Sequence, residues 1–174
     1  MIERKGIIEF KGVQVSVSGM DVNPGEKAKD FRVTKQDWSE ISLLEATTGK
    51  VRIIAAVPSL DTSVCDRETR RFNMEATALD QEIAIVVVSM DLPFAQERWC
   101  GAAGVDQVLV VSDQKYAEFG ENYACLMVEP RLLRRAVFII DKNNIIRYAK
   151  YLPALKDEPD YSEVLAEAKI VLQK

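Results

Sequence analysis

The sequence contains no histidine, and this absence excludes several kinds of chemistry at once. Without an imidazole, the chain has no Ser-His-Asp or Cys-His catalytic site, no histidine-ligated zinc and no haem held by a proximal histidine. It also has no imidazole-based pH switch. If the protein is an enzyme, another group must activate its nucleophile.

Cysteine and long apolar runs are also scarce. The three cysteines, Cys65, Cys100 and Cys125, are odd in number and form no Cys-x-x-Cys pair, which argues against a secreted disulfide framework, structural zinc and a thioredoxin-type dithiol. The longest apolar runs, at 53–57 and 83–88, are far shorter than the roughly 18 residues of a membrane-spanning helix. No signal-peptide-like stretch begins the sequence. We therefore predict a soluble, cytoplasmic protein.

Blocks of basic residues are absent too. Lysine and arginine total 23 and aspartate and glutamate 27, a net charge of −4, so we expect no nucleic-acid partner. No repeat, low-complexity tract or long polar linker divides the 174 residues. The length suits a self-sufficient core, and we predict a single domain over 1–174.

Apolar runs and helix-like segments alternate beyond residue 50. Before them, alternation around Lys11-Gly12 predicts a β-hairpin at about 7–17, followed by a turn at 23–26 and short strands or irregular cover near 31–33 and 38–43. Buried strands are expected at 51–57, Ile83–Ser89, 108–111 and Ala136–Ile140, with a further strand at 145–151. Helices are expected after Ser63, over Pro93–Ala103 and 115–123, and from Asp160 to Leu172. This order describes an α/β fold with a mixed central sheet flanked by helices.

Cys65 is the main candidate for chemistry because it begins a helix directly after a buried strand. Ligands of open α/β sheets bind beyond the carboxyl ends of the parallel strands, and the amide end of a helix favours a thiolate. Bringing a free thiol from a pKa near 8.5 to about 6 requires about 3.4 kcal/mol, whereas a helix terminus supplies at most about 2 kcal/mol. A nearby cation must supply the rest.

With histidine absent, the cation must be an arginine. Three arginines lie close to Cys65 in sequence, and two precede the strand Ala136–Ile140; these are Arg67, Arg70, Arg71, Arg134 and Arg135. If Ala136–Ile140 runs antiparallel to 51–57, its first residue lies where the earlier strand ends. This geometry favours Arg135. We expect Asp66 and Glu68 to point to solvent, because a carboxylate disfavours a neighbouring thiolate.

The residues around Cys65 also have plainer interpretations. A free cysteine is often buried as a small hydrophobe, although the polar, helix-starting surroundings of Cys65 favour a reactive, accessible thiol. Thr62 is expected to cap the helix, and its hydroxyl could also donate to the thiolate or orient a substrate oxygen. Cys125 lies beside apolar residues 126–128 and is interpreted as structural.

The pattern Pro58-x-x-x-Thr62-x-x-Cys65 resembles the peroxidatic signature of the peroxiredoxins. The wider sequence resembles thiol peroxidases, the atypical two-cysteine peroxiredoxins, over nearly the whole chain. The similarity continues in Thr69-Arg70-x-Phe72-Asn73, in the segment 89–101 around Cys100, and in 117–119, 135–137 and 158–161. Departures include Ser63 in place of the family's common proline, Glu68 where glutamine is frequent, and a shortened segment between Cys125 and Arg135.

The resemblance implies a thioredoxin-like fold and a peroxidase that reduces hydrogen peroxide and organic hydroperoxides without a cofactor or metal. Cys65 would attack the peroxide and become a sulfenic acid, and Cys100 would resolve it as an intramolecular disulfide that thioredoxin reduces. Pro58 would shield the pocket, while Thr62 and Arg135 would hold the peroxide oxygens. A homodimer is also implied.

Alternative functions stay open at this point. The same disulfide would serve a peroxide-responsive redox sensor, and the fold alone would serve a non-catalytic binding module. A disulfide needs Cα atoms about 4.4–6.8 Å apart, so two cysteines on separate helices are expected to require local opening. The first turn around Cys65, the helix Pro93–Ala103, or both are expected to open after oxidation, and the helix, with Gly101 and Gly104 at its end, is one candidate for the mobile segment.

Overall fold

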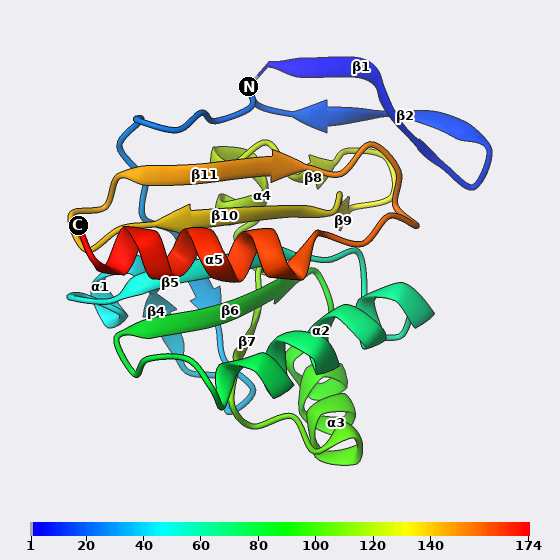
Figure 1. The fold of residues 1–174 in the computed structure, drawn as a ribbon. Helices are drawn as coiled ribbons and strands as arrows, with labels where there is room; N and C mark the ends of the chain where they lie inside the picture. Colours follow the sequence, from blue (N-terminus) through cyan, green and yellow to red (C-terminus); the bar gives the residue numbers. More distant parts are fainter. Residues whose placement is uncertain (1) are drawn as a thin grey trace.

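A seven-stranded mixed sheet forms the centre of the computed structural model, which describes residues 2–174 (Figure 1). The strand order is β11-β10-β5-β6-β7-β3-β4. The strands are β3 (Arg32–Thr34), β4 (Glu40–Ser42), β5 (Val51–Ala56), β6 (Ile83–Ser89), β7 (Leu109–Ser112), β10 (Ala136–Ile140) and β11 (Ile146–Tyr151). The chain therefore has the predicted mixed α/β architecture.

The middle of this sheet is parallel and its flanks are antiparallel. β5 pairs with β6 and β6 with β7 in parallel, and all six residues of β5 are buried because both faces of the strand are covered. β10 pairs antiparallel with β5, and Ala136 lies opposite Ala56. The start of β10 therefore meets the end of β5, as the choice of Arg135 required.

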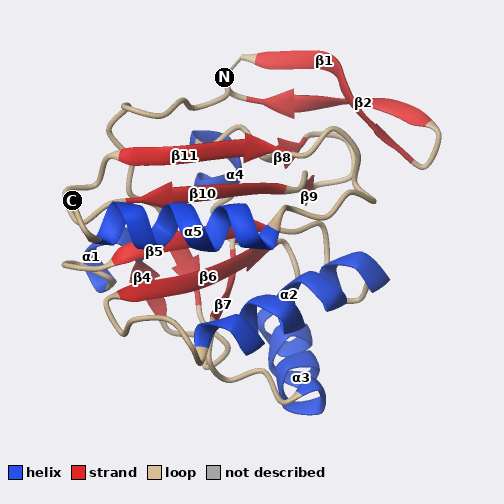
Figure 2. Cartoon of the chain, viewed as in Figure 1, coloured by secondary structure: helices blue, strands red, loops and turns tan. Residues whose placement is uncertain are grey.

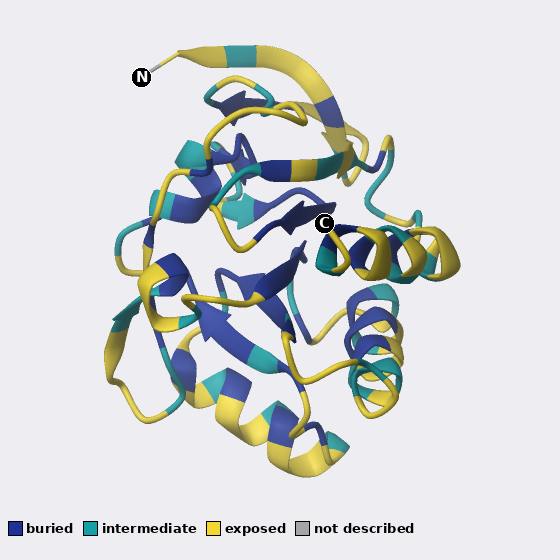
Figure 3. Cartoon of the chain, turned by 60° about the vertical axis from the view of Figure 1, so that its left-hand side comes forward, coloured by how far each residue is buried: buried dark blue, intermediate teal, exposed yellow. Residues whose placement is uncertain are grey.

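Helices cover both faces of the sheet (Figures 1 and 2). On one face lie α2 (Ser63–Ala76), α3 (Pro93–Ala103) and α5 (Tyr161–Leu172), and on the other lie α1 (Leu43–Ala46) and α4 (Glu118–Asn122). Alternate residues of β5 enter the two cores, since Ile53 packs with the first set and Ile54 with the second. Figure 3 shows dark blue strands between helices whose outer faces are yellow.

The amino-terminal hairpin belongs to a second, four-stranded sheet. β1 (Glu3–Phe10) and β2 (Val13–Ser18) form the predicted hairpin around Lys11-Gly12. β2 continues to β8 (Leu126–Met127) and β9 (Leu132–Leu133), in the order β1-β2-β8-β9. β8 and β9 were not predicted, because two-residue strands carry no periodicity.

Element boundaries differ from expectation at a few places. β7 begins one residue later than predicted, and α4 is shorter than the expected helix over 115–123. Ala117 precedes α4 in the left-handed region at φ 55°, and the Asp113 carboxylate accepts N–H groups from Phe119 and Gly120 in its first turn. At the other end of the chain, α5 starts where predicted, and the Asp160 side chain caps it by accepting the Glu163 N–H. No helix within residues 2–174 is both long and apolar enough to cross a membrane.

Candidate active site

Cys65 lies in the first turn of α2, just beyond the end of β5. The first intrahelical bond runs from the Asp66 N–H to the Thr62 carbonyl, so the N–H groups of residues 63–65 lie at the positive end of the helix. The preceding loop is held by Asp91, whose carboxylate accepts hydrogen bonds from the Ser59 hydroxyl at 2.7 Å and the Leu60 N–H at 2.8 Å. The end of β6 thus fixes the loop that presents Cys65.

Arg135 contacts the Cys65 sulfur, in the place that the strand geometry predicts. Its Nη2 lies 3.2 Å from Sγ, and its Nε and Nη2 also donate to the Leu155 carbonyl at 3.2 and 3.0 Å. Burial alone would lower the pKa of Arg135, but Glu68 and Cys65 outweigh it and hold that pKa above its usual value. The guanidinium therefore stays charged beside the sulfur.

The expectation that Glu68 points to solvent is wrong. Glu68 is fully buried and forms an ion pair with Nη1 of Arg135. It follows Cys65 by three residues, so helical geometry places it on the same face as the thiol. Burial raises the pKa of Glu68 to about 7 although Arg135 acts in the opposite direction. Cys65, Arg135 and Glu68 form a continuous row in which the guanidinium separates the carboxylate from the sulfur.

Asp66 is only partly directed to solvent. Its carboxylate accepts a hydrogen bond from Arg70 Nε at 2.9 Å and another from Trp99 Nε1 at 3.0 Å. Arg70 also donates to the Ala103 carbonyl at 3.2 Å. These contacts connect the helix that carries Cys65 to α3, which carries Cys100.

Thr62 occupies the N-cap position of α2 but does not cap it through its side chain, contrary to expectation. Its hydroxyl instead donates to the Ser59 carbonyl at 3.0 Å. The structure brings Thr62 and the buried Pro58 together on the wall of one pocket, with Arg135. The Thr62 hydroxyl is therefore used within the turn at 59–62 and does not accept an N–H from the first turn of the helix.

This pocket has a volume of about 670 Å³ and joins three distant parts of the chain. Its lining comes from the hairpin tip at 9–11, from the loop at 153–156, and from Pro58, Thr62, Val64 and Arg135. The sulfur is not in its wall, and Cys65 is 0% exposed, so the expectation of an accessible thiol is wrong for this conformation. The pocket reaches the guanidinium that touches the sulfur.

Cys100 is also buried, and it lies on the inner side of α3. Its Sγ accepts a hydrogen bond from Nε2 of Gln36 at 3.3 Å, a contact that no pattern in the sequence indicates. Burial raises the pKa of Cys100, and the Gln36 N–H opposes that rise. All three cysteines are free thiols, so the predicted Cys65–Cys100 disulfide is not formed in this conformation.

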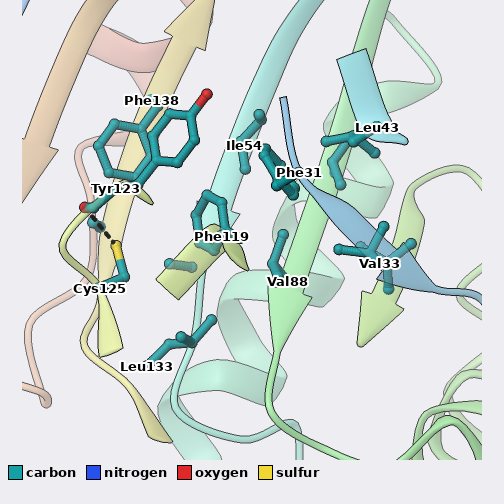
Figure 4. Close-up of a cluster of buried hydrophobic side chains, with 14 of the residues drawn as sticks. Phe31, Val33, Leu43, Ile54, Val88, Phe119, Tyr123, Cys125, Leu133 and Phe138 are labelled. Atoms are coloured by element: carbon teal, nitrogen blue, oxygen red, sulfur yellow. Dashed lines mark hydrogen bonds between the residues drawn. The ribbon is translucent and has the colours of Figure 1, made fainter. Parts of the chain in front are cut away.

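Cys125 lies in the other core, among the rings of Tyr123, Phe119 and Phe138 (Figure 4). Its thiol donates to the Tyr123 carbonyl at 3.4 Å. Burial raises the pKa of Cys125 to about 12. Within residues 2–174, no group of three acidic, cysteine or histidine side chains could hold a metal ion.

Known proteins that resemble this chain indicate its family and support its fold. The Redoxin family profile matches residues 23–165. The thiol peroxidase of Oceanobacillus iheyensis is 46% identical over 159 residues, covering 91% of this chain and 96% of that protein. That of Streptococcus pneumoniae is 44% identical over 163 residues, covering 94% and 99%. A peroxiredoxin-like protein from Aquifex aeolicus superposes with a TM-score of 0.85 at 36% identity, covering 94% of this chain and 96% of that one.

Proposed function

The chain belongs to the Redoxin family of peroxiredoxin-type peroxidases, and from this premise we propose that Cys65 is the residue that attacks the peroxide. The observation that carries the proposal is the 3.2 Å contact between Arg135 Nη2 and the Cys65 sulfur at the amino-terminal end of α2. A guanidinium and a helix amide end both favour a thiolate, which is the nucleophilic form of cysteine.

In the first step, the Cys65 thiolate attacks one oxygen of the peroxide and the O–O bond breaks. The sulfur is oxidised to sulfenic acid, and the other oxygen takes a proton and leaves as water or an alcohol. The Arg135 guanidinium donates N–H groups toward the oxygens on which charge develops. Glu68 is a positioning residue, because its ion pair fixes the plane of that guanidinium.

Pro58 and Thr62 line the approach to this centre. We propose that Pro58 shields the reacting atoms from water and that the Thr62 hydroxyl, once turned from the Ser59 carbonyl, holds a peroxide oxygen. The apolar part of the pocket includes Phe10 and Leu155, which suits organic hydroperoxides as well as hydrogen peroxide. The sulfur must become accessible through a small movement of the first turn of α2.

Cys100 is proposed as the resolving residue. Its thiol condenses with the Cys65 sulfenic acid, forming an S–S bond and releasing water. Both thiols are buried and hydrogen-bonded to different partners, Arg135 and Gln36, so a local rearrangement must bring the two sulfurs together before the bond forms. The movement of α3 stays a prediction.

The remaining proposals concern the setting of the reaction. A thioredoxin-type dithiol would regenerate both cysteines by exchange, and the reducing cytoplasm suits three free thiols. We also propose a homodimer and a single functional domain over 1–174, as the family resemblance implies. Light scattering of the purified protein tests the dimer.

The sharpest test is to map the disulfide formed after one equivalent of peroxide. Mass spectrometry of the digested protein should show a Cys65–Cys100 bridge and an unmodified Cys125. Cys100→Ser should react once with peroxide, lose one thiol at Cys65 and then turn over slowly with thioredoxin and its reductase. A bridge through Cys125, or full turnover of Cys100→Ser, would overturn the assignment of the resolving residue.

A further inference from the structure

The side-chain amide of Gln36 is directed at the Cys100 sulfur from outside α3. Gln36 lies in the loop 35–39 between β3 and β4, and its Nε2 is 3.3 Å from Sγ. Among residues 2–174, no other side chain hydrogen-bonds to this sulfur. An amide from a distant loop is thus the polar partner of a buried thiol.

The loop that carries Gln36 makes a second contact with α3. The Trp38 ring packs on the ring of Phe94, in the first turn of α3, with centroids 4.8 Å apart. Within the loop, Lys35 N–H donates to the Ser39 carbonyl at 2.8 Å, and Trp38 N–H donates to the Lys35 carbonyl at 3.0 Å. The ring contact and the turn place the loop, and with it Gln36, beside the helix.

Charged side chains around α3 are engaged with one another. On the elements packed against the helix they form pairs or accept amide hydrogen bonds, namely Lys35 with Asp37, Asp61 with Arg98, Asp66 with Arg70, and Asp106 with Gln107. Glu97 lies on the exposed face of α3 itself. Burial disfavours the Cys100 thiolate, and the Gln36 N–H is the contact that counteracts it.

We propose that Gln36 is a positioning residue for disulfide formation, one that holds the Cys100 sulfur and favours its thiolate form. The inference rests on the proposed role of Cys100. A thiolate accepts an N–H hydrogen bond more strongly than a thiol does, so the contact stabilises the form that reacts. The Cys100 thiolate attacks the sulfur of the Cys65 sulfenic acid, the S–O bond breaks, and the departing hydroxide takes up a proton to leave as water.

The kinetic test compares Gln36→Leu with the wild type after a single pulse of hydrogen peroxide. Disulfide formation, followed by acid quench and mass spectrometry, should be about fivefold slower at pH 7, the effect of one neutral hydrogen bond. The rates should converge at high pH, where Cys100 is ionised in both proteins. Gln36→Glu should be slower than Gln36→Leu at pH 7, because a carboxylate repels the thiolate.

Gln107→Leu makes the same change on an exposed loop after α3 and should resolve at the wild-type rate. The inference is overturned if Gln36→Leu forms the disulfide as fast as the wild type with the same pH midpoint, or if Gln36→Glu is the faster of the two variants.

A second measurement does not depend on peroxidase chemistry. In a Cys65→Ser, Cys125→Ser background, Cys100 is the remaining thiol, and its ionisation is read from thiolate absorbance near 240 nm. Adding Gln36→Leu should move the midpoint to higher pH by about 0.7 unit, the equivalent of a fivefold change. An unchanged midpoint overturns the role of Gln36 and leaves the proposed function standing. If the midpoint shifts in this background but the wild-type protein forms a disulfide that does not include Cys100, the proposed function is overturned instead.

Discussion

Cys65 and Cys125 are equally hidden from solvent, yet their surroundings favour opposite chemistry. Both are 0% exposed and neither is in a disulfide. Cys65 lies at the start of a helix and its sulfur accepts a hydrogen bond from Arg135, whereas the Cys125 S–H donates a hydrogen bond to the Tyr123 carbonyl. A donor beside sulfur favours the thiolate and an acceptor favours the thiol. Burial by itself therefore does not identify an inert cysteine.

The two sites also differ in whether their surroundings can stabilise a negative charge on the sulfur. Arg135 next to Cys65 is itself held by Glu68 and the Leu155 carbonyl, which keep the cation in place. Cys125 packs into a cluster of rings and aliphatic side chains, where an anion would lose its hydration. The proposal that Cys65 is the nucleophile therefore rests on the polar contacts around its sulfur and not on its exposure.

The largest expected effect comes from exchanging the two sulfurs for oxygen separately. Cys65→Ser should lose peroxidase turnover by on the order of a thousandfold or more, because the covalent step is removed. Cys125→Ser should change turnover by less than about twofold, since no step uses that thiol. Coupled turnover with thioredoxin, its reductase and hydrogen peroxide measures both. Comparable losses of turnover in the two folded variants would contradict the proposed difference between Cys65 and Cys125.

A smaller effect should follow from removing the guanidinium. Arg135→Met keeps much of the packing volume but withdraws the donors to sulfur and peroxide, so the rate of Cys65 oxidation should fall on the order of a hundredfold. The single variant leaves Glu68 buried without its partner, which should also lower the melting temperature.

Pairing Arg135→Met with Glu68→Gln separates these two consequences. The double variant should recover part of the lost melting temperature and none of the lost rate, because a neutral amide tolerates burial better than a carboxylate. Stopped-flow oxidation and thermal unfolding measure the two properties. A double variant that regains the rate would show that Arg135 acts on stability alone.

The smallest of the three effects concerns the pH dependence of stability. The pKa of Glu68 in the folded protein is about 7, above its value near 4.3 in an unfolded chain. The folded state therefore binds this proton more tightly. The contribution of Glu68 to stability is fully present below about pH 4.3 and is lost as the pH rises through 7.

The stability of Glu68→Gln relative to the wild type should therefore rise as the pH increases from about 4 to 7, by at most about 4 kcal/mol. Urea unfolding at a series of pH values measures the difference. Glu75→Gln is the control on the same helix, where Glu75 forms an ion pair with Arg71 nearer to solvent. Parallel stability curves for Glu68→Gln and the wild type would contradict this account.

Most of the helices and strands could be predicted from the sequence, because they depend on local patterns of apolar residues. Continuous apolar runs marked β5, β6 and β10, and Pro93 marked the start of α3. One topological assumption, an antiparallel β10, was enough to select Arg135 from five arginines, and the pairing of Ala136 with Ala56 confirms it.

The predictions that were wrong or absent share a different cause, because they concern contacts between distant segments. Glu68 was expected in solvent on local electrostatic grounds, but the helix places it against Arg135, a residue 67 positions away in sequence. Gln36 and Cys100 lie 64 positions apart in sequence, and no pattern in either segment predicts their contact. The hydroxyl of Thr62 went to the Ser59 carbonyl because the loop turns there.

Local sequence patterns were enough to predict the strand and helix order, the helix-starting position of Cys65 and the need for a cation in place of histidine, since apolar periodicity and residue chemistry act over short distances. Which side chains surround each sulfur depends instead on long-range contacts in the folded chain. Those contacts join segments that only folding brings together, and they set whether a buried thiol meets a donor, as Cys65 and Cys100 do, or an acceptor, as Cys125 does.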